Sequence, residues 1–150
     1  MYNSILVPID PAESDFANPA LKMAERFATQ YGAVLRLVAV ISPVRGVITE
    51  MLDADFDTRI ADDARKLLVE IAGSLNVPKD RVSISVRAGT VYHEVLEEAA
   101  AFNADLVIIA SHGDRFSSYL LGSNAAKVVR HADCSVLVVR GGEDEDEDED

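Results

Sequence analysis

Residues 106–139 read LVIIASHGDRFSSYLLGSNAAKVVRHADCSVLVV, and this stretch decides the fold. The continuous aliphatic run 106–110 predicts a strand that is buried on both faces. A polar loop follows, and a helical pattern then covers 122–131 before a second aliphatic run, 135–139. The order strand, loop, helix, strand places the positive end of a helix dipole at the carboxyl edge of a sheet. Anions, and phosphate above all, bind at such helix starts.

The rest of the chain alternates between strand and helix patterns. Apolar runs predict strands, and apolar residues repeated at helical spacing predict helices. Ser14 is expected to cap the first helix. Pro8 would remove a ladder hydrogen bond, so pairing of the first strand is expected to end near it. The predicted strands cover 4–10, 34–41, 81–87, 106–110 and 135–139, and the predicted helices cover about 15–31, 55–75, 91–102 and 122–131.

Five strands that alternate with four helices specify an α/β fold with a parallel sheet and helices on both faces. Strand 81–87 alternates strictly between polar and apolar residues, which is typical of a half-exposed edge strand. Ligands in such sheets bind at the carboxyl ends of the strands, where the strand order reverses. The loops after the first and fourth strands are therefore expected to flank a site. Segment 43–53 has no clear period and is interpreted as a loop that could form a lid.

The bulk composition fits one globular domain. The chain has 150 residues, of which 49% are hydrophobic, and no apolar run approaches the ~20 residues needed to cross a bilayer. No basic region precedes the first apolar run, so no secretory signal is expected. The single cysteine, Cys134, excludes an internal disulfide framework and suits a reducing compartment. These features predict a cytoplasmic protein.

The net charge of −12 is unevenly distributed. Residues 143–150 are eight consecutive acids, which leaves 14 bases against 18 acids in residues 1–142. So dense a block of like charge repels itself, and 141–150 is predicted to be a disordered tail. It could serve solubility, bind a partner or hold divalent cations weakly. Neither part of the chain has the basic stripe of a nucleic-acid-binding protein, so that class is excluded.

Three features are candidates for ligand binding, and each has a plainer interpretation. The helix start at Gly122 offers backbone N–H groups to an anion, but serine and asparagine are also ordinary helix caps. Asp10 could bond a ribose or a base or help to hold a metal, and it could equally form a turn before Pro11. His112 could bond a phosphate or could be a solvated loop residue.

No catalytic constellation is evident. The chain lacks a P-loop, a G-x-G-x-x-G motif, a nucleophile elbow, and histidines or acids at metal-ligand spacing. Cys134 is interpreted as a buried small residue and not as a nucleophile. A phosphate-binding protein with little or no turnover is therefore expected. A slow ATPase assisted by His112 or Asp10, and an interaction module without nucleotide, remain alternatives.

Residues 1–140 resemble the universal stress protein family, and in particular its small single-domain bacterial branch, the F and G types. The resemblance is carried by the opening Ile5-Leu6-Val7-Pro8-Ile9-Asp10, by Val40-Ile41, by Gly89, and above all by residues 120–139. The family's ATP-binding members have the loop pattern G-x2-G-x9-G-[ST]. Here Ala110 replaces the first glycine, and eight residues separate Gly113 from Gly122.

The resemblance implies a flavodoxin-like (Rossmann-like) sheet of order 3-2-1-4-5, a universal stress protein domain over 1–140, and binding of ATP and, with it, Mg²⁺. It implies a homodimer paired through the last strand, which the apolar run Val136, Leu137, Val138 and Val139 also favours, because an open apolar edge calls for a cover. Carried over by position, the adenosine would meet Pro8, Ile9, Asp10 and Val40. The ribose and phosphates would meet Ala110, His112, Gly113, Gly122, Ser123, Asn124 and Ala125.

Overall fold

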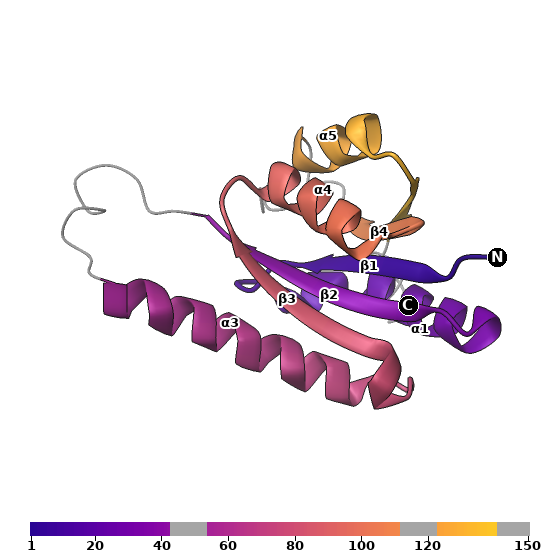
Figure 1. The fold of residues 1–150 in the computed structure, drawn as a ribbon, viewed down its shortest axis with the longest axis horizontal. Coiled ribbons are helices and arrows are strands. Elements are labelled where there is room, and N and C mark those ends of the chain that lie inside the picture. The colour runs from indigo at the N-terminus through magenta and orange to yellow at the C-terminus, as the bar shows by residue number, and fades with distance from the viewer. Residues whose placement is uncertain (43–53, 112–122, 141–150) are drawn as a thin grey trace, which may run out of the picture.

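The computed structural model describes residues 1–42, 54–111 and 123–140, without the side chains of 54–57 and 123. Five parallel strands lie in the order β3-β2-β1-β4-β5, with helices on both faces (Figure 1), which confirms the predicted fold. The predicted lid and the acidic tail lie outside the described residues. The elements are β1 (Ser4–Ile9), η1 (Ser14–Ala17), α1 (Asn18–Tyr31), β2 (Val34–Ile41), α3 (Ala54–Ser74), η2 (Lys79–Arg81), β3 (Val82–Ala88), α4 (Val91–Phe102), β4 (Leu106–Ser111), α5 (Ser123–His131) and β5 (Ser135–Arg140).

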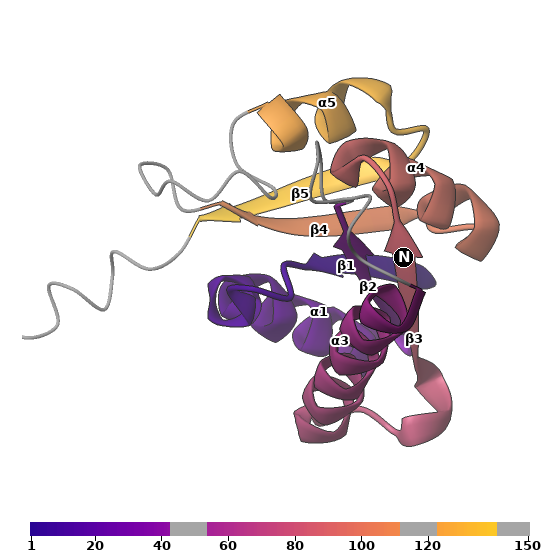
Figure 2. The same ribbon diagram turned by 90° about the vertical axis from the view of Figure 1, so that its left-hand side faces the viewer.

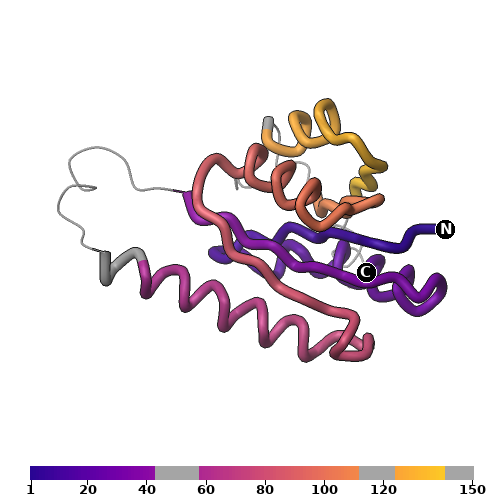
Figure 3. The backbone as a smooth tube through the Cα atoms, in the orientation of Figure 1, coloured from indigo at the N-terminus to yellow at the C-terminus, as the bar shows by residue number. Residues whose placement is uncertain are grey.

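Two apolar layers hold the sheet between its helices, because successive side chains of a strand point to opposite faces. Ile5 and Ile108 belong to the layer that packs against α1 and α3. Leu6 and Ile109 belong to the layer that packs against α4 and α5. The tube in Figure 3 shows α4 and α5 on one side of the strands and α3 on the other. The central strands are therefore largely buried on both faces, as their apolar runs predicted.

The helix bounds agree with the sequence pattern except at the start of α1. The prediction that Ser14 caps this helix is wrong. Ser14 is the first residue of the 3₁₀ helix η1, where the Phe16 N–H donates to the Glu13 carbonyl over 3.1 Å, and α1 begins one turn later. At the other end Gly32 adopts φ 72° and donates its N–H to the Ala28 carbonyl over 2.8 Å, a left-handed cap that glycine allows.

The backbone groups of β1 alternate between its two neighbours. The Asn3 carbonyl accepts from the Val34 N–H at the start of β2, over 2.9 Å. The Ser4 carbonyl accepts from the Asp105 N–H beside β4, also over 2.9 Å. In a parallel strand the N–H and C=O of one residue point the same way and those of the next residue point the other way. The nitrogen of Pro8, an even-numbered residue like Ser4, therefore faces β4.

Pairing along β1 differs on its two sides. The ladder with β2 runs the whole strand, from Ser4↔Val34 to Ile9↔Ala39, whereas the ladder with β4 stops at Leu6↔Val107. The prediction that pairing ends near Pro8 is thus right on the β4 side and wrong on the β2 side. The physical reason is that the donor which proline lacks would have faced β4 alone. Beyond Leu6, β1 is paired with β2 alone and β4 is paired with β5 alone.

Candidate functional site

The carboxyl ends of β1, β2 and β4 lie at one edge of the sheet, because all the strands are parallel. This edge holds Pro8, Ile9 and Asp10 at the end of β1, Val40 near the end of β2, and Ala110 near the end of β4. The amino end of α5, with Asn124 and Ala125 in its first turn, follows the loop that leaves β4. Figure 2 shows β4 and β5 running together on one side of β1. Ser123 is the first residue of α5, while His112, Gly113 and Gly122 lie outside the described residues.

Two of the predicted binding residues have side chains that no ligand could reach without rearrangement. Ile9 is fully buried in the layer beneath α1 and α3, and Val40 is 2% exposed in the layer beneath α4 and α5. The backbone of Val40 faces β1. Every second residue of a strand faces the same neighbour, and the Val34 N–H, six residues earlier in β2, donates to β1. Any recognition by these two positions would therefore come from peptide groups at the strand ends.

Asp10 forms the turn that leaves β1. Its Oδ1 accepts from the Ala12 N–H over 2.9 Å, and its carbonyl accepts from the Glu13 N–H over 3.1 Å. This is the geometry by which an aspartate folds the chain after a strand, and it confirms the turn interpretation. The same turn holds the carboxyl group at the carboxyl edge of β1.

Helix α5 is tied to the sheet and to α4. Val128 is fully buried in the layer shared with α4, and the Lys127 ammonium lies 4.8 Å from the centre of the Tyr92 ring. Helix α5 follows β4 and leads back to the parallel strand β5, so its amino end lies toward the carboxyl edge, where the helix dipole favours an anion. Among the described residues no group of three histidines, cysteines or acids could hold a metal ion.

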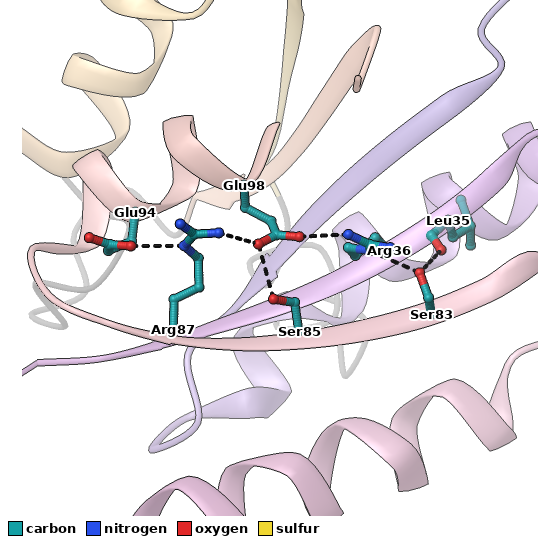
Figure 4. Close-up of polar contacts among 7 residues, drawn as sticks. All are labelled: Leu35, Arg36, Ser83, Ser85, Arg87, Glu94 and Glu98. Carbon is teal, nitrogen blue, oxygen red and sulfur yellow. Dashed lines mark hydrogen bonds and ion pairs between the residues drawn. The ribbon is translucent and has the colours of Figure 1, made fainter. Parts of the chain in front are cut away.

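A polar network under α4 is the main feature that the sequence interpretation missed (Figure 4). The Glu98 carboxylate, whose side chain is 3% exposed, accepts from Arg36 Nη1 over 2.8 Å, from Arg87 Nη1 over 2.6 Å and from Ser85 Oγ over 3.0 Å. Arg87 Nε also donates to Glu94 Oε1 over 2.8 Å. We call Arg36, Ser83, Ser85, Arg87, Glu94 and Glu98 the Glu98 network. It joins β2, β3 and α4.

The ionisation of Glu98 follows from its partners. Burial alone would raise the pKa of this carboxyl group, but hydrogen bonds from Arg36, Arg87 and Ser85 outweigh burial and hold the pKa below its usual value. The hydrogen bonds that Arg87 donates to the Glu94 and Glu98 carboxylates raise the pKa of Arg87 in turn. The group is thus a buried ion pair network whose charges are matched, and its role in the described structure is to fix α4 on the sheet.

Signals for this network were present in the sequence. Arg36 interrupts an apolar strand, Ser83, Ser85 and Arg87 share one face of an alternating strand, and Glu98 stands seven residues after the inward Val91 on the helix. A charged residue on an inward helix face needs a partner when it is buried. The partner could not be named, because Arg36 and Glu98 are 62 residues apart in the chain.

Cys134 fits the interpretation of a structural residue. It is half-buried and packs against the layer beneath α4 and α5. Burial, with Asp105 and Asp133 nearby, raises the pKa of its thiol. The thiolate that a nucleophile requires is therefore disfavoured.

The last strand forms one edge of the sheet. In the described structure β5 pairs with β4 on one side, along its whole length from Leu106↔Ser135 to Ser111↔Arg140. Val136, Leu137 and Val139 are partly buried against the two apolar layers, whereas Val138 is 39% exposed. An edge that carries an exposed valine is a surface on which a further strand could pair.

Comparisons with known proteins agree on one family. The family model described as Universal stress protein family matches residues 1–140. Universal stress protein G of Shigella flexneri is 34% identical over 143 residues, which cover 93% of this chain and 100% of that protein. The structure of universal stress protein UspA from Lactobacillus plantarum superposes with a TM-score of 0.70 at 26% identity and covers 93% of this chain and 98% of that one.

Two solved structures of the same fold hold nucleotides. A universal stress protein in complex with cAMP has a TM-score of 0.66 at 22% identity, with 92% of this chain and 97% of that chain covered. The universal stress protein from Archaeoglobus fulgidus in complex with dAMP has a TM-score of 0.54 at 20% identity, with 92% and 98% covered.

Proposed function

Because this chain belongs to the universal stress protein family, we propose that it binds an adenine nucleotide at the carboxyl edge of its sheet. The observation that carries the proposal is that the pairing of β1 with β4 ends at Leu6↔Val107, between the two strands where the strand order reverses. Ligands of open α/β sheets bind at this point. The proposed contacts are Pro8, Ile9, Asp10, Val40, Ala110, His112, Gly113, Gly122, Ser123, Asn124 and Ala125.

The described part of the edge supports separate binding positions for the base and for the phosphates of a nucleotide. Ile9 and Val40, at the ends of β1 and β2, are the proposed neighbours of the base, and the start of α5 suits phosphate. The complexes of the two relatives with cAMP and dAMP favour an adenine nucleotide, and we propose ATP. Mg²⁺ would bind together with ATP, because proteins usually hold it through substrate phosphates and one or two carboxylates. The Asp10 carboxylate is the group that we propose for this role.

We propose little or no turnover. Among the residues that the structure places, Cys134 has a raised thiol pKa and the Asp10 carboxylate is engaged in a turn, so neither is prepared for catalysis. A regulatory protein that responds to nucleotide level fits this arrangement. Slow ATP hydrolysis is the alternative that release of inorganic phosphate would reveal.

Nucleotide binding predicts a thermal shift. ATP with Mg²⁺ at 100 times its Kd should add about 2.7 kcal/mol to the free energy of unfolding, which is roughly 5–11 °C in Tm for a domain of this size. Ala125→Glu, which places a negative charge in the first turn of α5, should remove most of the shift by repelling the phosphates. The control is Arg130→Gln, which changes the net charge by the same amount in the last turn of that helix and should keep the shift.

The outcomes separate the candidate functions. No shift at millimolar ATP would favour the interaction module without nucleotide over the present proposal. An equal shift in the wild type and in Ala125→Glu would place the nucleotide away from α5.

We also propose a homodimer that pairs β5 of one copy with β5 of another. Val136, Leu137, Val138 and Val139 would form the interface, and the support for it is the open edge with its exposed Val138. A two-fold axis pairs the same strand with itself in antiparallel orientation and covers both edges at once.

A lysine on β5 should separate the dimer. In Val138→Lys a buried charge would face its own copy across the two-fold axis, and natural edge strands use lysine to prevent such pairing. We expect light scattering coupled to size exclusion to report the monomer mass of 16.2 kDa for this variant and twice that mass for the wild type. Val69→Lys is the matched control, because Val69 is also an exposed valine but lies on α3. A wild-type monomer at micromolar concentration would contradict the dimer.

No helix in the described ranges is both long and apolar enough to span a membrane. We propose a cytoplasmic location, which the single thiol supports.

A further inference from the structure

We propose that Arg140, the last residue of β5, binds the phosphate chain of the nucleotide and makes the site prefer ATP to nucleotides with fewer phosphates. Its neighbour Ser111, the last residue of β4, would add a hydroxyl group. The ligand in this proposal rests on the proposed function. The proposal adds the positive charge that the proposed contacts lack, since none of them is a lysine or an arginine.

A bound polyphosphate needs a positive charge in this protein. The chain has a net charge of −12, and residues 1–142 still hold 14 bases against 18 acids, a charge of −4. A protein of this sign repels the phosphates of ATP at long range. The start of a helix contributes only about half an elementary charge in return. A lysine or arginine close to the phosphates is therefore expected.

Two of the described strands carry a cation at the carboxyl edge. Arg87 lies near the end of β3, but it donates to Glu94 over 2.8 Å and to Glu98 over 2.6 Å, so its charge is already matched. Arg140 ends β5, its side chain is exposed, and none of the described carboxylates forms an ion pair with it. Arg140 is therefore the strand-end cation whose charge a ligand can use.

The register of the sheet places Arg140 beside the proposed contacts. Ala110↔Val139 and Ser111↔Arg140 are the last two pairs of the ladder between β4 and β5, and Ala110 is one of those contacts. Paired strands lie about 4.8 Å apart. The backbone of Arg140 is thus one strand away from Ser111, the residue that leads into the connection to α5.

The side chain of Arg140 lies on the face of the sheet that carries α5. Every second side chain of a strand enters the same layer, and both Val136 of β5 and Ile109 of β4 belong to the layer beneath α4 and α5. By this alternation Arg140 and Ser111 lie on that face as well. Figure 2 shows α4 and α5 on this side of the strands and α1 and α3 on the other. A phosphate at the amino end of α5 would have both side chains on its sheet side.

The chemistry of arginine suits a phosphate chain. Its guanidinium group is planar and presents its N–H donors as a fork that binds two oxygens at once. The gain in binding free energy rises with the charge of the ligand, so ATP should gain most, AMP less and adenosine nothing. This order distinguishes a contact with the phosphates from a general effect on the fold.

The variant Arg140→Gln removes the charge and the fork. By isothermal titration calorimetry we expect the Kd for ATP with Mg²⁺ to rise about tenfold, the loss of a hydrogen bond to a charged group. The Kd for AMP should rise less and that for adenosine should not change. Added salt should reduce the difference for ATP, because it screens exposed charges. Arg140→Lys keeps the charge without the fork and should give an intermediate Kd. The Tm without ligand should stay the same, since the side chain is exposed.

Two controls accompany this variant. Arg130→Gln makes the same change of charge in the last turn of α5, at the opposite end of that helix, and should leave the Kd for ATP unchanged. A chain that ends at Gly142 lacks the eight acids and should lose as much affinity on Arg140→Gln as the full chain does. A loss seen only when the acids are present would mean that Arg140 shields the ligand from the tail, and it would overturn the contact with phosphate.

The remaining outcomes separate this proposal from the proposed function. Equal Kd values for ATP in the wild type and in Arg140→Gln would overturn the role of Arg140 and leave nucleotide binding standing. An equal loss for ATP and adenosine would assign the effect to the fold and would overturn the role as well. A wild type that binds neither ATP nor adenosine would overturn the proposed function, and the role of Arg140 with it.

Discussion

Glu98→Ala should lower the free energy of unfolding by roughly 3 kcal/mol, the loss expected when one partner of a buried ion pair is removed. The variant removes three hydrogen bonds from a carboxylate that is 3% exposed. It leaves the guanidinium groups of Arg36 and Arg87 without their shared counter-charge in a half-buried position. Urea unfolding should show the difference at pH 7, and Tm should fall by about 6–12 °C.

The neighbouring residue provides a matched control. Glu97 occupies the next position on α4, but its side chain is 56% exposed and its partner, His93, is 3.8 Å away. Glu97→Ala makes the same change in helix propensity and should alter the free energy of unfolding by no more than ~0.5 kcal/mol. If the two alanine variants unfold at the same urea concentration, the Glu98 network does not stabilise the contact between α4 and the sheet.

Gly89→Ala is expected to lower the free energy of unfolding by about 2–3 kcal/mol, because backbone strain and a steric clash act at this position. Gly89 has φ 145°, a backbone conformation that costs side-chain-bearing residues ~1–3 kcal/mol. A Cβ built there would lie 2.7 Å from Glu94 Oε2 and 3.0 Å from its Cγ. The carboxylate would have to move, and with it the ion pair between Glu94 and Arg87. The Gly89 N–H also bonds the Ile41 carbonyl over 3.0 Å, so the turn joins β3 to the end of β2.

A second glycine and a double variant separate these penalties. Gly73 lies in α3 with nothing within 4 Å of a Cβ, so Gly73→Ala should raise the free energy of unfolding by up to ~1 kcal/mol through helix propensity. In a Glu94→Ala background the Gly89→Ala change should lose its steric part and keep its backbone part. A Gly89→Ala variant as stable as the wild type would contradict both penalties and the φ from which they derive.

Much of the fold could be predicted because its signals are local. The central strands are largely aliphatic runs, as a strand buried on both faces requires, and α4 occupies residues 91–102 as its apolar spacing predicted. The edge position of β3 followed from its strict alternation. The order of the strands did not follow from these patterns, since alternation specifies a parallel sheet but not which strands are neighbours. It came from the resemblance to the family.

The candidate site was predicted in outline and not in its details. The placement of Asp10, Val40 and Ala110 at one edge needs only parallel strands and their carboxyl ends. That Ile9 and Val40 can contribute only backbone depends on which face of the sheet each side chain enters. The structure shows the turn that the Asp10 carboxylate forms with the Ala12 N–H, and the ligand role of Asp10 stays a prediction.

The stretch 106–139 by itself determined a buried strand, a helix start suited to an anion and a second strand, because aliphatic runs and helical spacing are properties of neighbouring residues. Only the tertiary structure decided where each backbone N–H points and which distant side chains meet. The N–H that Pro8 lacks would have faced β4 and not β2, since the side to which each residue of a strand points is set by its pairing with both neighbours. Glu98 of α4 can be buried because Arg36 and Arg87 reach it from two strands, β2 and β3, and a charge can stay inside only when the fold supplies its counter-charges.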